Sequence, residues 1–196
     1  MKILVHACCA HCLAETLAGL EEVKKKEWEP VVRWCNPNIH PLIEWRRRLK
    51  AVKMLCERAK LLLLADETYG LRDFLHALDG TYGAGDRCRI CYALRLGDAA
   101  RTAKEAGIPL FTTTLITSVH QDHAAIRAAG EKAGKENGVS FVYRDLRGVE
   151  DVDAKLVFSL YKQQYCGCVF SEEERFAPTT THLYPPRPGL PRADSP

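Results

Sequence analysis

The chain has 196 residues and a formal net charge of +3, and 46% of its residues are hydrophobic. This length fits one domain with a sizeable core, and no apolar run reaches the roughly 20 residues that a membrane span needs. The mild positive charge permits a nucleic-acid partner without requiring one. The short apolar stretch at Ile3–Val5 runs into His6 and lacks the features of a secretory signal, so we expect a cytoplasmic protein.

Strand and helix patterns alternate along the chain. In chain order we expect strand 2–6, helix 14–26, strand 30–34, helix 42–60, strand 61–65, helix 71–78, a glycine-rich loop 80–85, helix 91–106, strand 110–115, helix 122–137, strand 139–144 and helix 151–164. This alternation predicts an α/β fold, a parallel sheet with helices on both faces. Residues 1–176 are expected to form a single domain, and the proline-rich residues 177–196 an extended or disordered tail.

Charged runs carry less information. The basic cluster Arg46-Arg47-Arg48, with Lys50, lies in the expected helix 42–60. A solvated helix face is the default interpretation of such a cluster, and contact with phosphate groups is the alternative.

The chain contains nine cysteines, an unusually high number for a protein of a reducing compartment, where it indicates metal binding or redox chemistry. Six of them form close pairs: Cys8 with Cys9, Cys88 with Cys91, and Cys166 with Cys168. The first pair directly follows the first expected strand. Because ligands gather where the strands of a parallel sheet end, we expect the cysteine-bearing loops to meet at one edge of the sheet.

Soft thiolates favour zinc, copper or iron–sulfur clusters. Six thiolates, or seven with Cys12, exceed the four of a structural zinc site. A four-iron cluster uses about four, which leaves thiolates for a second metal or a redox disulfide. Asp86, two residues before Cys88, could add a hard oxygen ligand, whereas Cys56 lies on an apolar helix stripe and Cys35 beside a turn, as packing residues do.

Several short motifs, in order, resemble the QueH-type epoxyqueuosine reductase family. They are Cys8-Cys9-Ala10-x-Cys12, Asn36-Pro37-Asn38-Ile39-His40-Pro41, Asp86-Arg87-Cys88-x-x-Cys91 with Arg95, Thr112-Thr113-Thr114-Leu115 with Ser118 and Gln121, and Tyr161-x-Gln163-x-Tyr165-Cys166-Gly167-Cys168 followed by Ser171-Glu172-Glu173-Glu174-Arg175. Each motif is short, but together they cover most of residues 1–176. His11 departs from the family's usual proline between the first cysteines.

The resemblance implies a HUP-like, Rossmann-like fold and an oxidoreductase that converts epoxyqueuosine to queuosine at the wobble position of tRNA anticodons. It further implies a 4Fe-4S cluster beside a mononuclear metal, expected to be iron, and an unidentified electron donor. By motif match the metal ligands would be Cys8, Cys9, Asp86, Cys88, Cys91, Cys166 and Cys168. Asp86, Tyr161, Gln163 and Tyr165 would be catalytic residues. Which ligand serves which metal, and the role of Cys12, stay open.

Three other functions compete with this interpretation. A zinc-stabilised RNA-binding module would also use clustered cysteines, and a thiol–disulfide oxidoreductase would use Cys9 and Cys12 without metal. An ATP-dependent tRNA thiolase would carry a glycine-rich phosphate loop after the first strand, where this chain has Ala7-Cys8-Cys9-Ala10.

Overall fold

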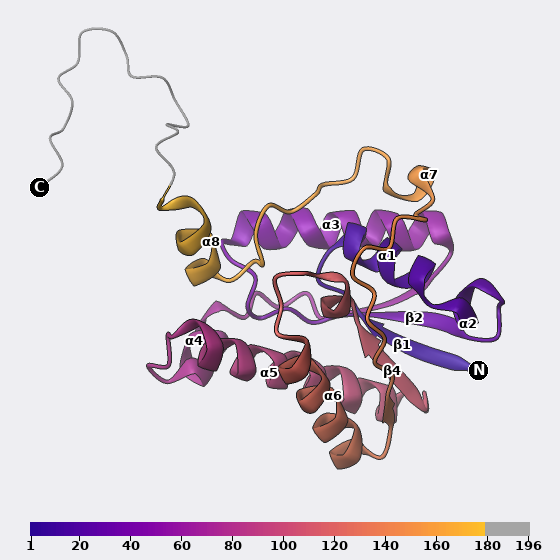
Figure 1. Ribbon diagram of the computed structural model, residues 1–196, viewed down its shortest axis with the longest axis horizontal. Helices are drawn as coiled ribbons and strands as arrows, with labels where there is room; N and C mark the ends of the chain where they lie inside the picture. The colour runs from indigo at the N-terminus through magenta and orange to yellow at the C-terminus, as the bar shows by residue number, and fades with distance from the viewer. Residues whose placement is uncertain (179–196) are drawn as a thin grey trace, which may run out of the picture.

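The computed structural model describes residues 1–178, so most of the expected tail, residues 179–196, lies outside the described residues. Its centre is an all-parallel sheet in the order β3-β2-β1-β4-β5 (Figure 1). The strands are β1 (Lys2–His6), β2 (Glu29–Trp34), β3 (Leu62–Ala65), β4 (Leu110–Thr113) and β5 (Ser140–Phe141). The predicted α/β fold with a parallel sheet is confirmed.

Helices cover both faces of the sheet. They are α1 (Ala10–Gly19), α2 (Glu21–Lys24), α3 (Leu42–Ala59), α4 (Leu71–Leu78), α5 (Ala84–Glu105), the 3-10 turn η1 (Thr114–Thr117), α6 (His123–Asn137), α7 (Ala154–Val157) and α8 (Val169–Phe176). α1 and α3 lie on one side of the sheet, and α5 and α6 on the other (Figure 1). Among the described helices, none has a stretch apolar and long enough to cross a bilayer.

Alternating side chains of the strands explain the two hydrophobic layers. Leu4 and Val31 pack with α5 and α6, whereas Val5 and Val32 pack with α1 and α3. Successive residues of a strand point to opposite faces, and both faces of this sheet are covered, so consecutive residues are apolar in the middle of β1 and β2, at Ile3–Val5 and Val31–Val32.

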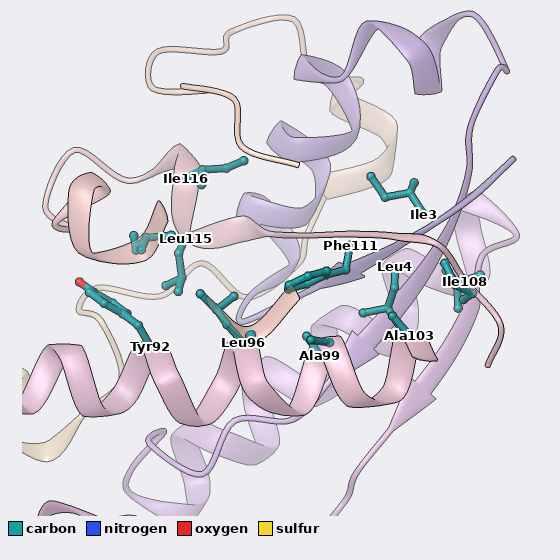
Figure 2. Close-up of a cluster of buried hydrophobic side chains, with 14 of the residues drawn as sticks. Ile3, Leu4, Tyr92, Leu96, Ala99, Ala103, Ile108, Phe111, Leu115 and Ile116 are labelled. Atoms are coloured by element: carbon teal, nitrogen blue, oxygen red, sulfur yellow. The ribbon is translucent and has the colours of Figure 1, made fainter. Parts of the chain in front are cut away.

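The long helix α5 carries the larger of these layers. Tyr92, Leu96, Ala99 and Ala103 recur every three or four residues and face β1 and β4, where Phe111 fills the space between helix and sheet (Figure 2). The small alanines toward the carboxyl end of the helix let its backbone approach the sheet. The position of α5 is therefore fixed along its length, including the turns that bear cysteines.

Several helices differ from expectation. The helix predicted over residues 151–164 is wrong: α7 contains only Ala154–Val157, and the chain then turns at Ser159, whose φ of 58° is left-handed. Leu160 is nevertheless buried, so its four-residue repeat with Val152 reflects packing of an irregular segment. In place of that helix, α8 follows the last cysteine pair.

Helix α5 also begins earlier than expected, at Ala84, within the glycine-rich stretch. Cys88 and Cys91 consequently lie inside its first two turns and not in a loop before it. Helix α1 likewise starts at Ala10, which places Cys12 in its first turn. The cysteines are thus held more rigidly than loop residues would be.

Two helical glycines should respond to substitution in opposite directions. A Cβ at Gly134 would lie 2.6 Å from the carbonyl oxygen of Val139, whereas a Cβ at Gly97 meets nothing within 4 Å. We expect Gly134→Ala to lower the free energy of unfolding by about 1–3 kcal/mol through overpacking. Gly97→Ala should raise it by about 0.5–1 kcal/mol through helix propensity. Chemical denaturation of both variants tests this; equal effects would contradict it.

Candidate metal centre

The cysteines gather at the carboxyl edge of the sheet, between β1 and β4. From these neighbouring strands the chain passes to opposite sides of the sheet, into α1 after β1 and through η1 into α6 after β4 (Figure 1). Ligands bind at such points in open parallel sheets. Cys8 follows β1 and Thr114 follows β4. The Cys8 amide donates to Thr114 Oγ1 at 3.2 Å, and the Cys8 sulfur lies 3.2 Å from the same oxygen.

Three cysteines at the start of α1 form a compact group. The sulfurs of Cys8, Cys9 and Cys12 all lie within 4.8 Å of one another, a spacing that could hold a metal ion. Cys9 is also the N-cap of α1, since its sulfur accepts a hydrogen bond from the Cys12 amide at 3.0 Å. The amide groups at this helix end favour negative charge on the sulfurs.

Beside this group lies a cavity of about 550 Å³. Six cysteines line it: Cys8 and Cys12 from the start of α1, Cys88 and Cys91 from α5, and Cys166 and Cys168 from the segment before α8. All are free thiols. The prediction that the cysteine-bearing segments meet at one edge of the sheet is confirmed. Cys9 is 1% exposed and does not line the cavity, but its sulfur lies close to those of Cys8 and Cys12.

The other expected site residues are distributed unevenly. Gln163 lines the cavity, and its amide nitrogen lies 3.2 Å from the Cys12 sulfur. Tyr165 also lines the cavity, but its hydroxyl donates to the carbonyl of His40. Tyr161 and Asp86 are not among the lining residues.

The latter two side chains are engaged elsewhere. The Tyr161 hydroxyl donates to Glu44 Oε2 at 2.5 Å. The Asp86 carboxylate is exposed and accepts from Arg89 Nη1 at 3.0 Å. The cavity therefore gathers the cysteines and Gln163, while Asp86 stands at its outer side on the first turn of α5.

The basic cluster that contains Arg48 was expected to form a solvated helix face. Arg48 itself is 1% exposed. Its Nε donates to Glu44 Oε1 at 2.6 Å, and its two Nη atoms donate to the carbonyls of Tyr165 and Cys166 at 2.9 and 3.0 Å. Arg48 thereby fixes the backbone that carries the last cysteine pair. In the sequence, only the four-residue spacing of Glu44 and Arg48 pointed to this ion pair. The same spacing is typical of exposed pairs, so it did not predict that the pair is buried.

Gly167 is required where this segment turns. Its φ is 115°, a region that side chains rarely adopt, and a Cβ there would lie 3.1 Å from Arg48 Nη1. Its carbonyl accepts from the His40 amide at 2.7 Å. Cys166 and Cys168 are thus directed into the cavity by a turn that only glycine fits without strain.

The thiols differ in acidity. Hydrogen bonds from Cys12 and Cys9 hold the pKa of Cys8 well below its usual range, and the Arg95 guanidinium adds to this shift. Burial raises the pKa of Cys9, and the bond to Cys8 raises that of Cys12. Burial raises the pKa of Cys91 to about 12. A metal that binds here must displace the protons of the thiols that it coordinates.

Gly167→Ala should lower both stability and metal retention. Placing alanine at this φ costs about 1–3 kcal/mol, and the contact with Arg48 displaces the cysteine-bearing turn. The control is Gly138→Ala, whose φ of 71° is also positive but where a Cβ meets nothing within 4 Å. Denaturation and metal analysis should show destabilisation in both variants and metal loss only in Gly167→Ala. Full metal content in Gly167→Ala would contradict the assigned role.

Comparison with known proteins agrees with this geometry. The family model described as "Epoxyqueuosine reductase QueH" matches residues 3–174. The chain is 37% identical over 177 residues to the epoxyqueuosine reductase QueH of Dehalococcoides mccartyi, covering 89% of this chain and 94% of that protein. The corresponding protein of Thermotoga maritima is 30% identical over 182 residues, covering 88% and 91%. That of Helicobacter pylori is 34% identical over 183 residues, covering 86% of this chain and 49% of that longer protein. With cysteines from three segments around one cavity, the chain belongs to the QueH family of epoxyqueuosine reductases.

Proposed function

We propose that the chain reduces epoxyqueuosine in tRNA to queuosine. The epoxide oxygen leaves as water, the two carbons that carried it form a double bond, and the reaction consumes two electrons and two protons. A one-electron donor protein or reductant would supply the electrons in two steps. The observation that carries this proposal is the convergence of six cysteine thiols on one cavity in a member of this family.

The donor set suits a thiolate-bound cofactor. We assign a 4Fe-4S cluster and a mononuclear metal, expected to be iron, to Cys8, Cys9, Cys88, Cys91, Cys166 and Cys168, with Asp86 as an oxygen ligand. Bound there, the metals would supply single electrons and a Lewis acid for the epoxide oxygen.

Asp86 can reach this role at little energetic cost. Its ion pair with Arg89 is exposed on both sides, with side-chain exposures of 71% and 67%. Surface pairs of this kind contribute about 0–1 kcal/mol, so a metal could compete for the carboxylate.

Among the polar residues, Gln163 is the best candidate to touch the substrate. Its amide nitrogen contacts Cys12, and its buried Oε1 has no hydrogen-bond partner among the described residues. A substrate hydroxyl or N–H would satisfy this oxygen. Tyr165 and Tyr161 have their hydroxyls committed to His40 and Glu44, and so would orient the last cysteine-bearing segment.

The tRNA backbone would be held by basic side chains near the cavity. Arg46, Arg47 and Lys50 are exposed on α3. The Arg47 guanidinium lies 5.8 Å from the centre of the Tyr161 ring, which ties this helix face to the segment that leads to Gln163. We propose that these groups contact phosphates, in keeping with a cytoplasmic tRNA-modifying enzyme.

Anaerobic purification with iron, sulfide and zinc analysis tests the proposal first. About four sulfides and at least about four irons per chain are expected. Nucleoside analysis of tRNA that carries epoxyqueuosine should then show queuosine after addition of a chemical reductant. Zinc alone, without iron after reconstitution, would favour the RNA-binding module.

Cys88→Ala should lose iron, whereas Cys56→Ala should keep it. Cys88 lines the cavity, but Cys56 is buried among the apolar residues between α3 and the sheet. Mutating a residue that only hydrogen-bonds a metal ligand reduces metal affinity or activity by up to about 100-fold. Loss of the ligand itself should therefore reduce activity by at least about 100-fold. Full iron content and activity in Cys88→Ala would remove Cys88 from the ligand set.

The double variant Arg46→Gln and Lys50→Gln should bind tRNA more weakly and with less dependence on salt. Each lost phosphate contact lowers the slope of log affinity against log salt by about 1. Lys104→Gln, exposed near the carboxyl end of α5, is the control. Filter binding over a salt series measures both slopes, and an unchanged slope in the double variant would place the tRNA elsewhere.

A further inference from the structure

Arg95 is buried next to the cysteine site, in contact with Cys91. The residue is 1% exposed and lies one helical turn after Cys91 on α5. Its Nη2 donates to Asn36 Oδ1 at 3.1 Å, and its Nε donates to His6 Nε2 at 3.4 Å. Its Nη1 points at the Cys91 sulfur, 3.8 Å away.

None of these partners is a carboxylate. Asn36 is an amide that also donates to the carbonyl of Ala7. His6 Nε2 lies 3.4 Å from Arg95 Nε and 3.3 Å from the carbonyl oxygen of Cys35, and an imidazole carries no negative charge that could neutralise the arginine. Within residues 1–178, Arg95 takes part in no ion pair.

The other arginines with little exposure are paired differently. Arg48 bonds Glu44, Arg87 bonds Glu174, and Arg33 bonds Asp98, with N–O distances of 2.6, 2.6 and 2.7 Å. Arg95 alone of these four faces sulfur where the others face carboxylate. An arginine does not lose its proton in a protein, and an uncompensated buried charge is strongly unfavourable. Its counter-charge must therefore come from the cysteine site.

We propose that Arg95 is the built-in counter-cation of the metal centre, a positioning residue that stabilises its negative charge and raises its reduction potential. This inference rests on the proposed function, because it requires a cluster bound by these cysteines. Reduction adds one electron to a group already carrying the charge of its thiolates. A fixed positive charge beside it, shielded from water, favours the reduced form.

Hydrogen bonding alone would be a different role, and two substitutions separate it from charge. Arg95→Lys keeps the positive charge, but the lysine ammonium has fewer N–H donors than the guanidinium and the side chain is shorter. Arg95→Gln removes the charge and keeps an amide that can donate to Asn36. The control is Arg101→Gln on the same helix, where the arginine side chain is 59% exposed and pairs with Asp98.

The measurement is a spectroelectrochemical titration of each reconstituted protein under anaerobic conditions, with iron counted on the same samples. We expect Arg95→Gln to shift the potential to more negative values than wild type. Arg95→Lys and Arg101→Gln should remain close to wild type. Equal shifts in Arg95→Lys and Arg95→Gln, or a wild-type potential in Arg95→Gln, would overturn the proposal.

If Arg95→Gln holds no cluster, its potential cannot be measured, and the iron contents of the two variants test the proposal instead. Iron retained by Arg95→Lys and lost from Arg95→Gln supports a need for charge, provided that circular dichroism shows Arg95→Gln to be folded. If Arg95→Gln is unfolded, the potential of Arg95→Lys decides alone: a value close to wild type supports the proposal, and a clear shift overturns it. Loss of iron from both variants also overturns it. A wild-type protein that binds no iron refutes the proposed function instead.

Discussion

The arrangement of the site depends on the buried pair of Glu44 and Arg48. One guanidinium bonds a carboxylate of its own helix and two carbonyls of a segment more than a hundred residues later. Glu44 uses its second oxygen for Tyr161. Such a pair repays the cost of its burial only when its donors and acceptors are satisfied together, and here they are. The irregular segment before α8 owes its course largely to this pair, since α7 provides only one helical turn.

Around this pair, three kinds of backbone hold the cysteines. A helix N-terminus carries Cys9 and Cys12, the interior of a long helix carries Cys88 and Cys91, and a glycine turn carries Cys166 and Cys168. The first two are anchored by the sheet, through strand β1 and through the packing of α5. The third belongs to no strand or long helix, and hydrogen bonds from the Arg48 side chain and the His40 amide hold it in place.

Much of this could be predicted from the sequence. Strands with short runs of consecutive apolar residues, and helices with apolar residues spaced three and four apart, predict a parallel sheet with two covered faces. The cysteine pairs at strand and helix ends predict convergence. The repeat of Val152, Leu156 and Leu160 misled, because apolar side chains at such spacing also serve an irregular segment that lies on a core.

Other features could not be predicted, because they depend on contacts between distant parts of the chain. Arg48 and Arg46 look alike in sequence, and only the docking of residues 165–168 buries one of them. Arg95 belongs to a short motif whose purpose the motif does not reveal. Asp86 lies in the first turn of α5, where its carboxylate pairs with Arg89, and the sequence placed it before the helix.

The order of the segments in the chain has a consequence for biogenesis. Cys8, Cys88 and Cys91 belong to parts that leave the ribosome early, and the strands that position them are complete once β4 has been made. The wall formed by Cys166 and Cys168 is made last of the three. Proteins fold from the N-terminal side as they are made, so an open half-site precedes the closed one. Enclosure of the cavity is thereby tied to the synthesis of this last segment, and a product that stops before it would expose the other thiols.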